Sequence, residues 1–141
     1  MARILIAEDN EKLRNLLGEA LVLQGHSVCE AEHGRLAIRS WDQSFYDVLI
    51  TDMQMPFADG PEVIRTIRHN HPEAKVIAMS ADPHILASLE QSALTTPQYS
   101  FTKPVDITTL QAAIEQLEQA QRRSPPKLFK QDTASMKIRW S

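Results

Sequence analysis

Short, β-branched apolar runs alternate with amphipathic helical patterns along most of this chain. The runs predict five strands, at residues 3–7, 27–31, 48–51, 76–80 and 99–102. In the first helical pattern, leucine and alanine recur at the spacing of one helical face: Leu13, Leu16, Leu17, Ala20 and Leu21. A weaker pattern predicts a second helix at about 34–44. Because strands that alternate with helices pair in parallel, we predict a doubly wound α/β fold with helices on both faces of one sheet.

The size and composition of the chain indicate one globular domain. It has 141 residues, of which 43% are hydrophobic and 23% are charged. No apolar stretch approaches the roughly 20 residues of a membrane-spanning helix, and the first apolar run is too short for a signal peptide. We therefore expect a cytoplasmic protein without a membrane span.

Several side chains that carry chemistry in other proteins are expected to have only structural roles here. The single Cys29 excludes an internal disulfide, and its position in a strand pattern predicts a buried thiol. Trp41 and Phe45, at helical spacing, are expected to pack in the core. The five histidines lack a nearby set of acidic or Cys partners, so we expect them in solvent.

Charge divides the chain into two parts. Residues 122–141 carry six Lys or Arg and one Asp, a net charge of +5, and since the whole chain has −3, residues 1–121 carry −8. We predict a domain at 1–121 and a basic C-terminal tail at 122–141, which is either disordered or a short docking segment. The acidic domain argues against nucleic-acid binding by this part, because phosphate contacts need clustered Lys and Arg.

Three acidic residues stand where predicted strands end. Glu8 and Asp9 follow the first strand, and Asp52 follows the third. Parallel strands place their carboxyl ends at one edge of the sheet, where α/β proteins bind their ligands. Carboxylates that meet there repel each other unless a divalent cation binds between them or their pKa values rise. The pattern therefore predicts a cation site at this edge.

Two further elements make the pattern more specific. Ser80 follows the fourth strand and Lys103-Pro104 follows the fifth, while Asp52 begins the sequence Asp-Met-Gln-Met-Pro. An acid pair, an Asp, a Ser and a Lys-Pro pair in this order resemble the receiver domain of bacterial two-component response regulators. The resemblance covers residues 2 to about 121. It implies a flavodoxin-like, five-stranded parallel sheet of order 2-1-3-4-5.

The resemblance implies that Asp52 is a phosphoacceptor. It would take a phosphoryl group from the phosphohistidine of a sensor histidine kinase or a phosphotransfer protein. Mg²⁺ is the implied cofactor, held by Glu8, Asp9, Asp52 and the backbone carbonyl of Gln54. The domain would then be a signalling switch rather than an enzyme, catalysing only its own phosphorylation and slow autodephosphorylation.

The phosphoryl oxygens need their own partners, and the resemblance supplies four. Lys103 would pair with them through its ammonium group. The Ser80 hydroxyl and the backbone N–H groups of Ala81 and Met53 would donate hydrogen bonds to them. Taken singly, these residues also have structural explanations: Ser80 can cap a helix, and Lys103-Pro104 can form a turn. Glu8 and Asp9 likewise suit the N-terminus of the first helix.

Two features depart from the family pattern. The aromatic residue that usually lies three positions before the Lys is Ser100, and strand alternation places Tyr99 and Phe101 on the side opposite Ser100. Whether either of them replaces the usual aromatic switch stays open. The small-residue turn before the fifth strand is replaced by residues 92–98, which predicts a reshaped connection.

Two other functions stay open at the level of sequence. One is the receiver fragment of a DNA-binding transcriptional regulator, because too few residues follow position 121 for a DNA-binding output domain. The other is a Mg²⁺-dependent phosphohydrolase, although the second Asp that such enzymes place two residues after the nucleophile is Gln54 here. The sequence does not specify the kinase, the downstream effector or the oligomeric state, and it leaves a phosphorylation-linked dimer open.

Overall fold

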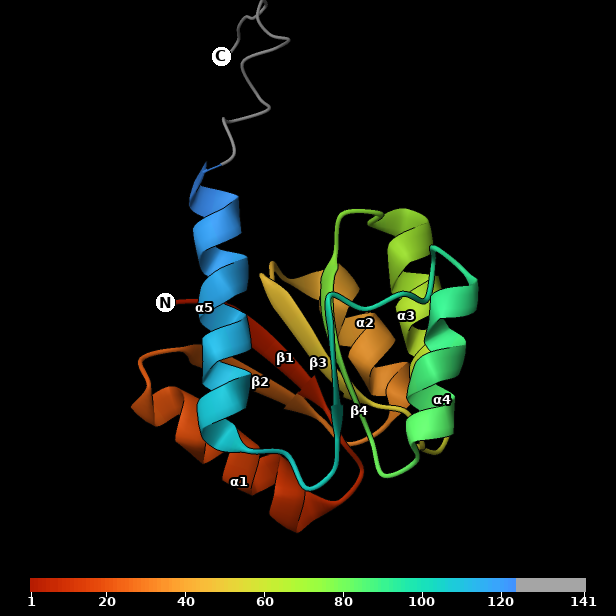
Figure 1. Ribbon diagram of the computed structural model, residues 1–141, viewed down its shortest axis with the longest axis horizontal. Coiled ribbons are helices and arrows are strands. Elements are labelled where there is room, and N and C mark those ends of the chain that lie inside the picture. The colour runs from red at the N-terminus through yellow and green to blue at the C-terminus, as the bar shows by residue number, and fades with distance from the viewer. Residues whose placement is uncertain (124–141) are drawn as a thin grey trace, which may run out of the picture.

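The computed structural model describes residues 1–123, which form one parallel sheet covered by helices (Figure 1). The strands, in the order β2-β1-β3-β4-β5, are β1 (Arg3–Ala7), β2 (Ser27–Ala31), β3 (Val48–Asp52), β4 (Lys75–Ser80) and β5 (Tyr99–Thr102). The helices are α1 (Glu11–Leu23), α2 (Gly34–Gln43), α3 (Gly60–Asn70), α4 (Pro83–Ser88), the short 3₁₀ helix η1 (Leu89–Gln91) and α5 (Ile107–Arg123). The predicted doubly wound fold and strand order are confirmed. The expectation for the basic tail falls almost wholly outside the described residues.

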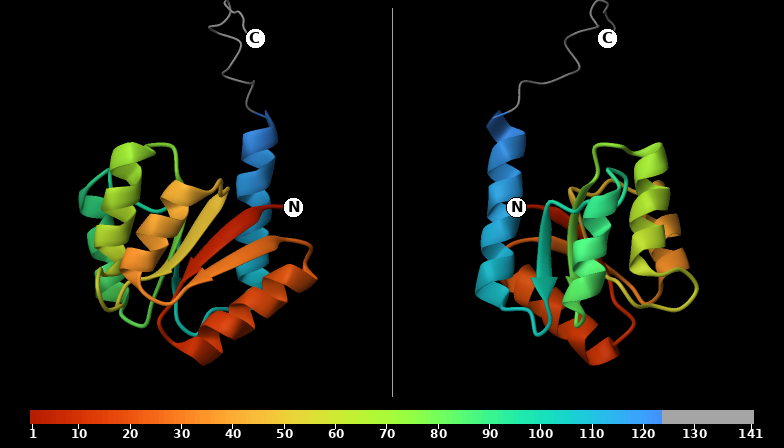
Figure 2. Two further views of the ribbon diagram at one scale, coloured as in Figure 1. Left: turned by 180° about the vertical axis from the view of Figure 1, so that it is seen from behind. Right: turned by 45° about the vertical axis from the view of Figure 1, so that its right-hand side comes forward.

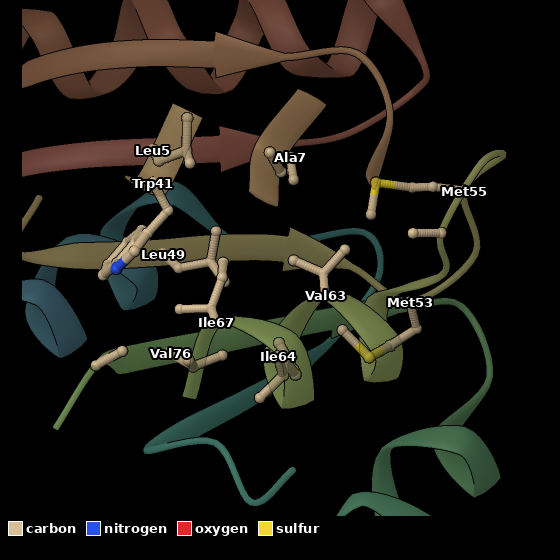
Figure 3. Close-up of a cluster of buried hydrophobic side chains, with 14 of the residues drawn as sticks. Leu5, Ala7, Trp41, Leu49, Met53, Met55, Val63, Ile64, Ile67 and Val76 are labelled. Carbon is tan, nitrogen blue, oxygen red and sulfur yellow. The ribbon is translucent and has the colours of Figure 1, made fainter. Parts of the chain in front are cut away.

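Helices cover both faces of the sheet (Figures 1 and 2): α1 and α5 lie on one face, and α2, α3 and α4 lie on the other. Successive residues of a strand point to opposite faces, so a central strand that is covered twice is apolar throughout. On the α3 side, Leu5 and Leu49 of the sheet pack with Ile64 and other buried side chains (Figure 3). On the α1 and α5 side, Ile6 packs with Leu17 and other buried side chains.

Residues with clear capping preferences mark the starts and ends of the helices. Asp59 caps α3, with its carboxylate accepting the Glu62 N–H at 3.0 Å, and Pro61 lies in the first turn. The Asp106 carboxylate accepts the Thr109 N–H at 3.2 Å at the start of α5. Two residues past α1, Gly25 has φ = 97°, a left-handed conformation that Gly adopts at little cost.

Four side-chain predictions were wrong. The Cys29 side chain is exposed, because β2 is an edge strand. Phe45 is 63% exposed, because α2 ends at Gln43 and the helical spacing from the buried Trp41 no longer applies. Leu16 is 58% exposed on the outer side of α1.

The fourth correction concerns His26, which is buried rather than solvated. Its Nδ1 accepts the Ala2 N–H at 3.0 Å, and its Nε2 lies 2.9 Å from Oε1 of Gln111. A neutral ring satisfies both bonds when Nε2 carries the proton. His26 therefore joins the start of β1 to α5.

The connection between α4 and β5 is held by Arg68 of α3, a buried cation that the sequence did not identify. Its Nε donates to the Ala74 carbonyl at 3.2 Å, and its Nη2 donates to Oε1 of Gln98 at 3.0 Å. Its Nη1 donates to three backbone carbonyls of the connection: Ala93, Leu94 and Thr96. Burial lowers the pKa of the guanidinium from its usual value. These bonds fix the connection to α3 through the backbone.

Among residues 1–123, the structure contains no helix whose length and apolar character would let it span a bilayer.

Candidate functional site

The strand registers bring the three predicted acids to the carboxyl edge of the sheet. Ala7 of β1 is level with Thr51 of β3, so the residues that follow them, Glu8 and Asp52, lie side by side. Asp9 is the next residue of the β1–α1 loop. One oxygen from each of the three carboxylates lies within 4.8 Å of the others. The sequence prediction of an acidic cluster at this edge is confirmed.

Burial differs among the three acids. Glu8 is 1% exposed and Asp52 is 5% exposed, whereas Asp9 is exposed to solvent. Carboxylates about 5 Å apart repel each other by roughly 3 kcal/mol at an effective dielectric constant near 20. An all-oxygen set of ligands is what Mg²⁺ prefers, and a divalent cation removes this repulsion. The donor set therefore fits Mg²⁺.

Lys103, which follows β5, pairs with both buried acids. Its Nζ lies 2.8 Å from Oε1 of Glu8 and 3.2 Å from Oδ1 of Asp52. Burial by itself lowers the pKa of Lys103, but the bond to Glu8 and the attraction of Asp52 outweigh it and leave the pKa raised. Burial raises the pKa of Glu8, and the hydrogen bond from Lys103 opposes this rise in part. Lys103 therefore carries its charge between the two carboxylates.

The Glu8 backbone and side chain are anchored by three neighbours. The Glu8 N–H donates to the Ala31 carbonyl at 3.1 Å, and Nη1 of Arg14 donates to the Glu8 carbonyl at 2.9 Å. Oε2 of Glu8 accepts the Asn10 N–H at 3.1 Å, and Asn10 itself is the N-cap of α1. Sequence reasoning missed both Asn10 and Arg14. The N-cap preference of Asn was an available signal for the first, whereas no pattern indicates the second.

The loop after β3 surrounds the Asp52 carboxylate with backbone. Oδ1 of Asp52 accepts the Met53 N–H at 2.8 Å, and the Met53 carbonyl accepts the Gly60 N–H at 3.0 Å. A Cβ at Gly60 would collide with the Asp52 carbonyl oxygen, so only Gly allows α3 to start this close. Gln54 is exposed on this loop.

Ser80 ends β4 beside the cluster and is fully buried. Its Oγ accepts the Asp82 N–H at 3.0 Å, and its carbonyl accepts the Lys103 N–H at 2.8 Å. Ala81 is exposed next to it. All the predicted site residues therefore lie at one edge of the sheet, with the Ser80 hydroxyl oxygen also serving the turn into α4.

The residues of β5 alternate as predicted. Tyr99 and Phe101 are half-buried and pack against the α1 and α5 cluster, whereas Ser100 is exposed on the opposite side. In the described state, both aromatic side chains belong to the core on that face. No aromatic side chain occupies position 100, from which the family switch usually operates.

A family model described as the response regulator receiver domain matches residues 4–115 of this chain. The chain belongs to the receiver domain family. Phosphoryl transfer and Mg²⁺ binding at an acidic pocket are general to receiver domains, and Glu8, Asp9 and Asp52 form an acidic cluster in this one. This receiver domain therefore acts in two-component signalling, in which receivers work with histidine kinases and output domains.

Relatives of this receiver domain come from both sides of such systems. The transcriptional regulatory protein PcoR of Escherichia coli is 31% identical over 83% of this chain and 51% of its own length. The sensor protein EvgS of Escherichia coli is 32% identical over 86% of this chain, but over only 10% of its own length. The chain thus spans about half or less of these curated relatives.

A solved structure supports the same family. The response regulator TrrA of Thermotoga maritima, in complex with Mg²⁺-BeF, is 29% identical and has a TM-score of 0.75. The match covers 83% of this chain and 99% of that one.

Proposed function

We propose that Asp52 accepts the phosphoryl group in this receiver domain. The observation that carries the proposal is the position of its carboxylate, which is 5% exposed at the carboxyl edge between Glu8, Asp9 and Lys103. An Asp52 oxygen forms a bond to phosphorus, and the bond from phosphorus to the donor's imidazole nitrogen breaks, with the nitrogen keeping the electron pair. The product is an aspartyl phosphate.

The same acids are proposed to hold Mg²⁺. Glu8, Asp9 and Asp52 would contribute carboxylate oxygens, and the exposed loop residue Gln54 would contribute its backbone carbonyl. When bound, the cation supplies positive charge that offsets the repulsion between the nucleophile and the phosphoryl oxygens. The all-oxygen donor set supports this assignment.

Lys103 would exchange partners during the reaction. In the described state its ammonium group contacts Glu8 and Asp52. We propose that it turns to a phosphoryl oxygen when Asp52 is modified, because the phosphoryl group carries more negative charge than the carboxylate it replaces. The Ser80 hydroxyl and the N–H groups of Ala81 and Met53 would donate to the remaining oxygens.

The donor is proposed to be the phosphohistidine of a sensor kinase or a phosphotransfer protein. Aspartyl phosphate formation would shift the receiver between two conformations and so signal to an effector, as a DNA-binding output domain or a separate protein. Gln54, in place of the second Asp of a phosphohydrolase, favours a phosphoacceptor over a turnover enzyme.

A labelling experiment tests the assignment. The full chain is incubated with acetyl phosphate and Mg²⁺, and its intact mass is measured with and without a chelator. We expect one acid-stable, base-labile phosphoryl adduct that requires Mg²⁺ and is lost in Asp52→Asn. The matched control is Asp59→Asn, an exposed carboxylate on the same loop, which Asn replaces as N-cap of α3 without loss. An adduct on Asp52→Asn, or none on the parent chain, would exclude Asp52 as the phosphoacceptor.

A further inference from the structure

Arg14, near the start of α1, contacts the backbone of the acidic cluster and a second acid outside it. Its Nη1 donates a hydrogen bond to the Glu8 carbonyl at 2.9 Å, and its Nε lies 3.6 Å from Oε1 of Glu30 on β2. The Arg14 side chain is only 14% exposed, because α1 packs against β1 and β2 (Figure 2). The guanidinium therefore joins α1 to the β1–α1 loop and to the edge strand β2.

The Glu8 carbonyl belongs to the peptide group that links two of the proposed metal ligands, Glu8 and Asp9. A peptide group is planar, so a bond that holds its carbonyl also holds the backbone of Asp9. Within residues 1–123, the exposed Asp9 side chain forms no hydrogen bond and no ion pair. Glu8, by contrast, is also held through its side chain, by Asn10 and Lys103. The position of the Asp9 carboxylate therefore depends on the backbone that Arg14 holds.

A guanidinium group suits this position because of its shape and its charge. It presents several N–H groups in a fixed planar arrangement, so one side chain can reach two partners. A charged donor also makes a stronger hydrogen bond to a carbonyl than a neutral donor does. Glu30 supplies the counter-charge, and Gly18 leaves room for it, because a Cβ at Gly18 would collide with Oε2 of Glu30. Arg14 thus holds the Glu8 carbonyl while its own charge is balanced by Glu30.

We propose that Arg14 is a positioning residue for Mg²⁺, which holds the Glu8–Asp9 peptide group where both carboxylates reach one cation. The inference rests on the proposed assignment of Glu8, Asp9 and Asp52 as the Mg²⁺ ligands. Arg14 contacts neither the cation nor the phosphoryl group, and it acts through the backbone of the ligands. Removing a group that orients metal ligands in this way typically weakens metal binding by roughly 10- to 100-fold.

The charge of Arg14 taken alone has the opposite effect on the cation. A positive side chain near the acidic cluster repels Mg²⁺, so its removal in Arg14→Met would tighten Mg²⁺ binding if charge were its only contribution. Loss of the bond to the Glu8 carbonyl weakens binding instead, because Asp9 is no longer held in place. The direction in which the Mg²⁺ dissociation constant changes therefore separates positioning from charge.

A chemical-shift titration of the full, ¹⁵N-labelled chain with MgCl₂ measures this dissociation constant. We expect Arg14→Met to raise the Mg²⁺ Kd by about tenfold, and Arg14→Lys, which keeps the charge and a donor, to recover part of the affinity. In the metal-free chain, Arg14→Met should shift the Asp9 amide signal and lower its {¹H}–¹⁵N NOE. Arg39→Met is the matched control, since it removes an exposed arginine of α2, and it should leave both measurements as they are in the parent chain.

The positioning role and the metal assignment fail in different samples. A Kd of Arg14→Met that equals or falls below the parent value overturns the positioning role, even if urea unfolding shows lower stability, because a purely structural role leaves the affinity of the folded chain unchanged. If Arg14→Met does not fold, Arg14→Lys decides: a Kd above the parent value supports the role, and an equal one overturns it. If the parent chain itself shows no response to Mg²⁺, the metal assignment is wrong and this inference falls with it.

Discussion

Replacing Lys103 by Met should destabilise the domain in a way that depends on pH. Nζ lies 2.8 Å from Glu8 and 3.2 Å from Asp52, and each attraction is roughly 5 to 6 kcal/mol at an effective dielectric constant near 20, before desolvation is subtracted. Removing one partner of a buried ion pair costs about 3 to 5 kcal/mol. Because the Lys103 side chain is 21% exposed, we expect the lower end, about 3 kcal/mol at pH 7.

The pH dependence follows from Glu8. Its pKa is already raised by burial in the folded state, so its folded carboxyl holds a proton more tightly than the unfolded one. Stability is therefore highest below the unfolded value and falls as pH rises through the folded value. Lys103→Met removes the hydrogen bond that opposes the rise, which raises the Glu8 pKa further. The loss of stability should appear as pH rises above about 4.5 and should be small below it.

Urea unfolding at several pH values between 4 and 8 measures this difference. Lys12→Met serves as the control, since Lys12 is an exposed lysine of α1, and it should stay within about 0.5 kcal/mol of the parent. Mg²⁺ should restore part of the stability of Lys103→Met, because it replaces the missing positive charge. Equal destabilisation at pH 4 and pH 7, or a more stable Lys103→Met at pH 7, would refute the assignment of Lys103 as the counter-charge of this cluster.

Three other substitutions test separate features. Arg68→Met should cost about 3 kcal/mol, because it leaves the Ala74 carbonyl and the Gln98 amide oxygen without their guanidinium partner. Hydrogen exchange should quicken in residues 92–98, and unchanged exchange would contradict the role of Arg68 in holding this connection. Gly60→Ala should cost about 2 kcal/mol, because the added Cβ collides with the Asp52 carbonyl oxygen. The same displacement should slow phosphorylation by acetyl phosphate, and kinetics equal to those of the parent would show that the β3–α3 loop relaxes without moving Asp52. Tyr46 should titrate near pH 12, because burial first and its bond with Cys29 second raise its pKa to about 12. Its contribution to stability should then be complete below pH 10 and lost toward pH 12, which absorbance at alkaline pH can measure against Tyr46→Phe.

The apolar runs of the sequence were sufficient to predict the five strands of the sheet. The bounds of β1, β2 and β5 match their apolar runs, while β3 and β4 each extend by one polar residue, Asp52 and Lys75. Those residues lie within the backbone hydrogen-bond ladder, which apolar patterning does not report. Strand ends also located the acidic cluster, because parallel strands deliver their carboxyl ends to one edge.

Contacts between elements that are far apart along the chain could not be predicted from local sequence patterns. Arg68 reads as an ordinary charged residue of an amphipathic helix, yet it is buried because the connection before β5 wraps around it. His26 is buried by its bonds to the first residues and to α5. Cys29 was misassigned because its apolar neighbours indicate a strand without indicating whether the strand lies at the edge, where one side meets solvent.

The hydrogen bonds from Arg68 to the α4–β5 connection affect how the surface of that connection can evolve. The partners of Arg68 in Ala93, Leu94 and Thr96 are backbone carbonyls, which every amino acid supplies. Side chains at Ala93 and Leu94 can therefore change without removing an Arg68 bond, whereas the Thr96 hydroxyl adds its own bonds to the Ser92 and Leu89 carbonyls. A lineage carrying Arg68 can vary the side chains of this part of the α4–β5 surface while the backbone beneath it keeps its course.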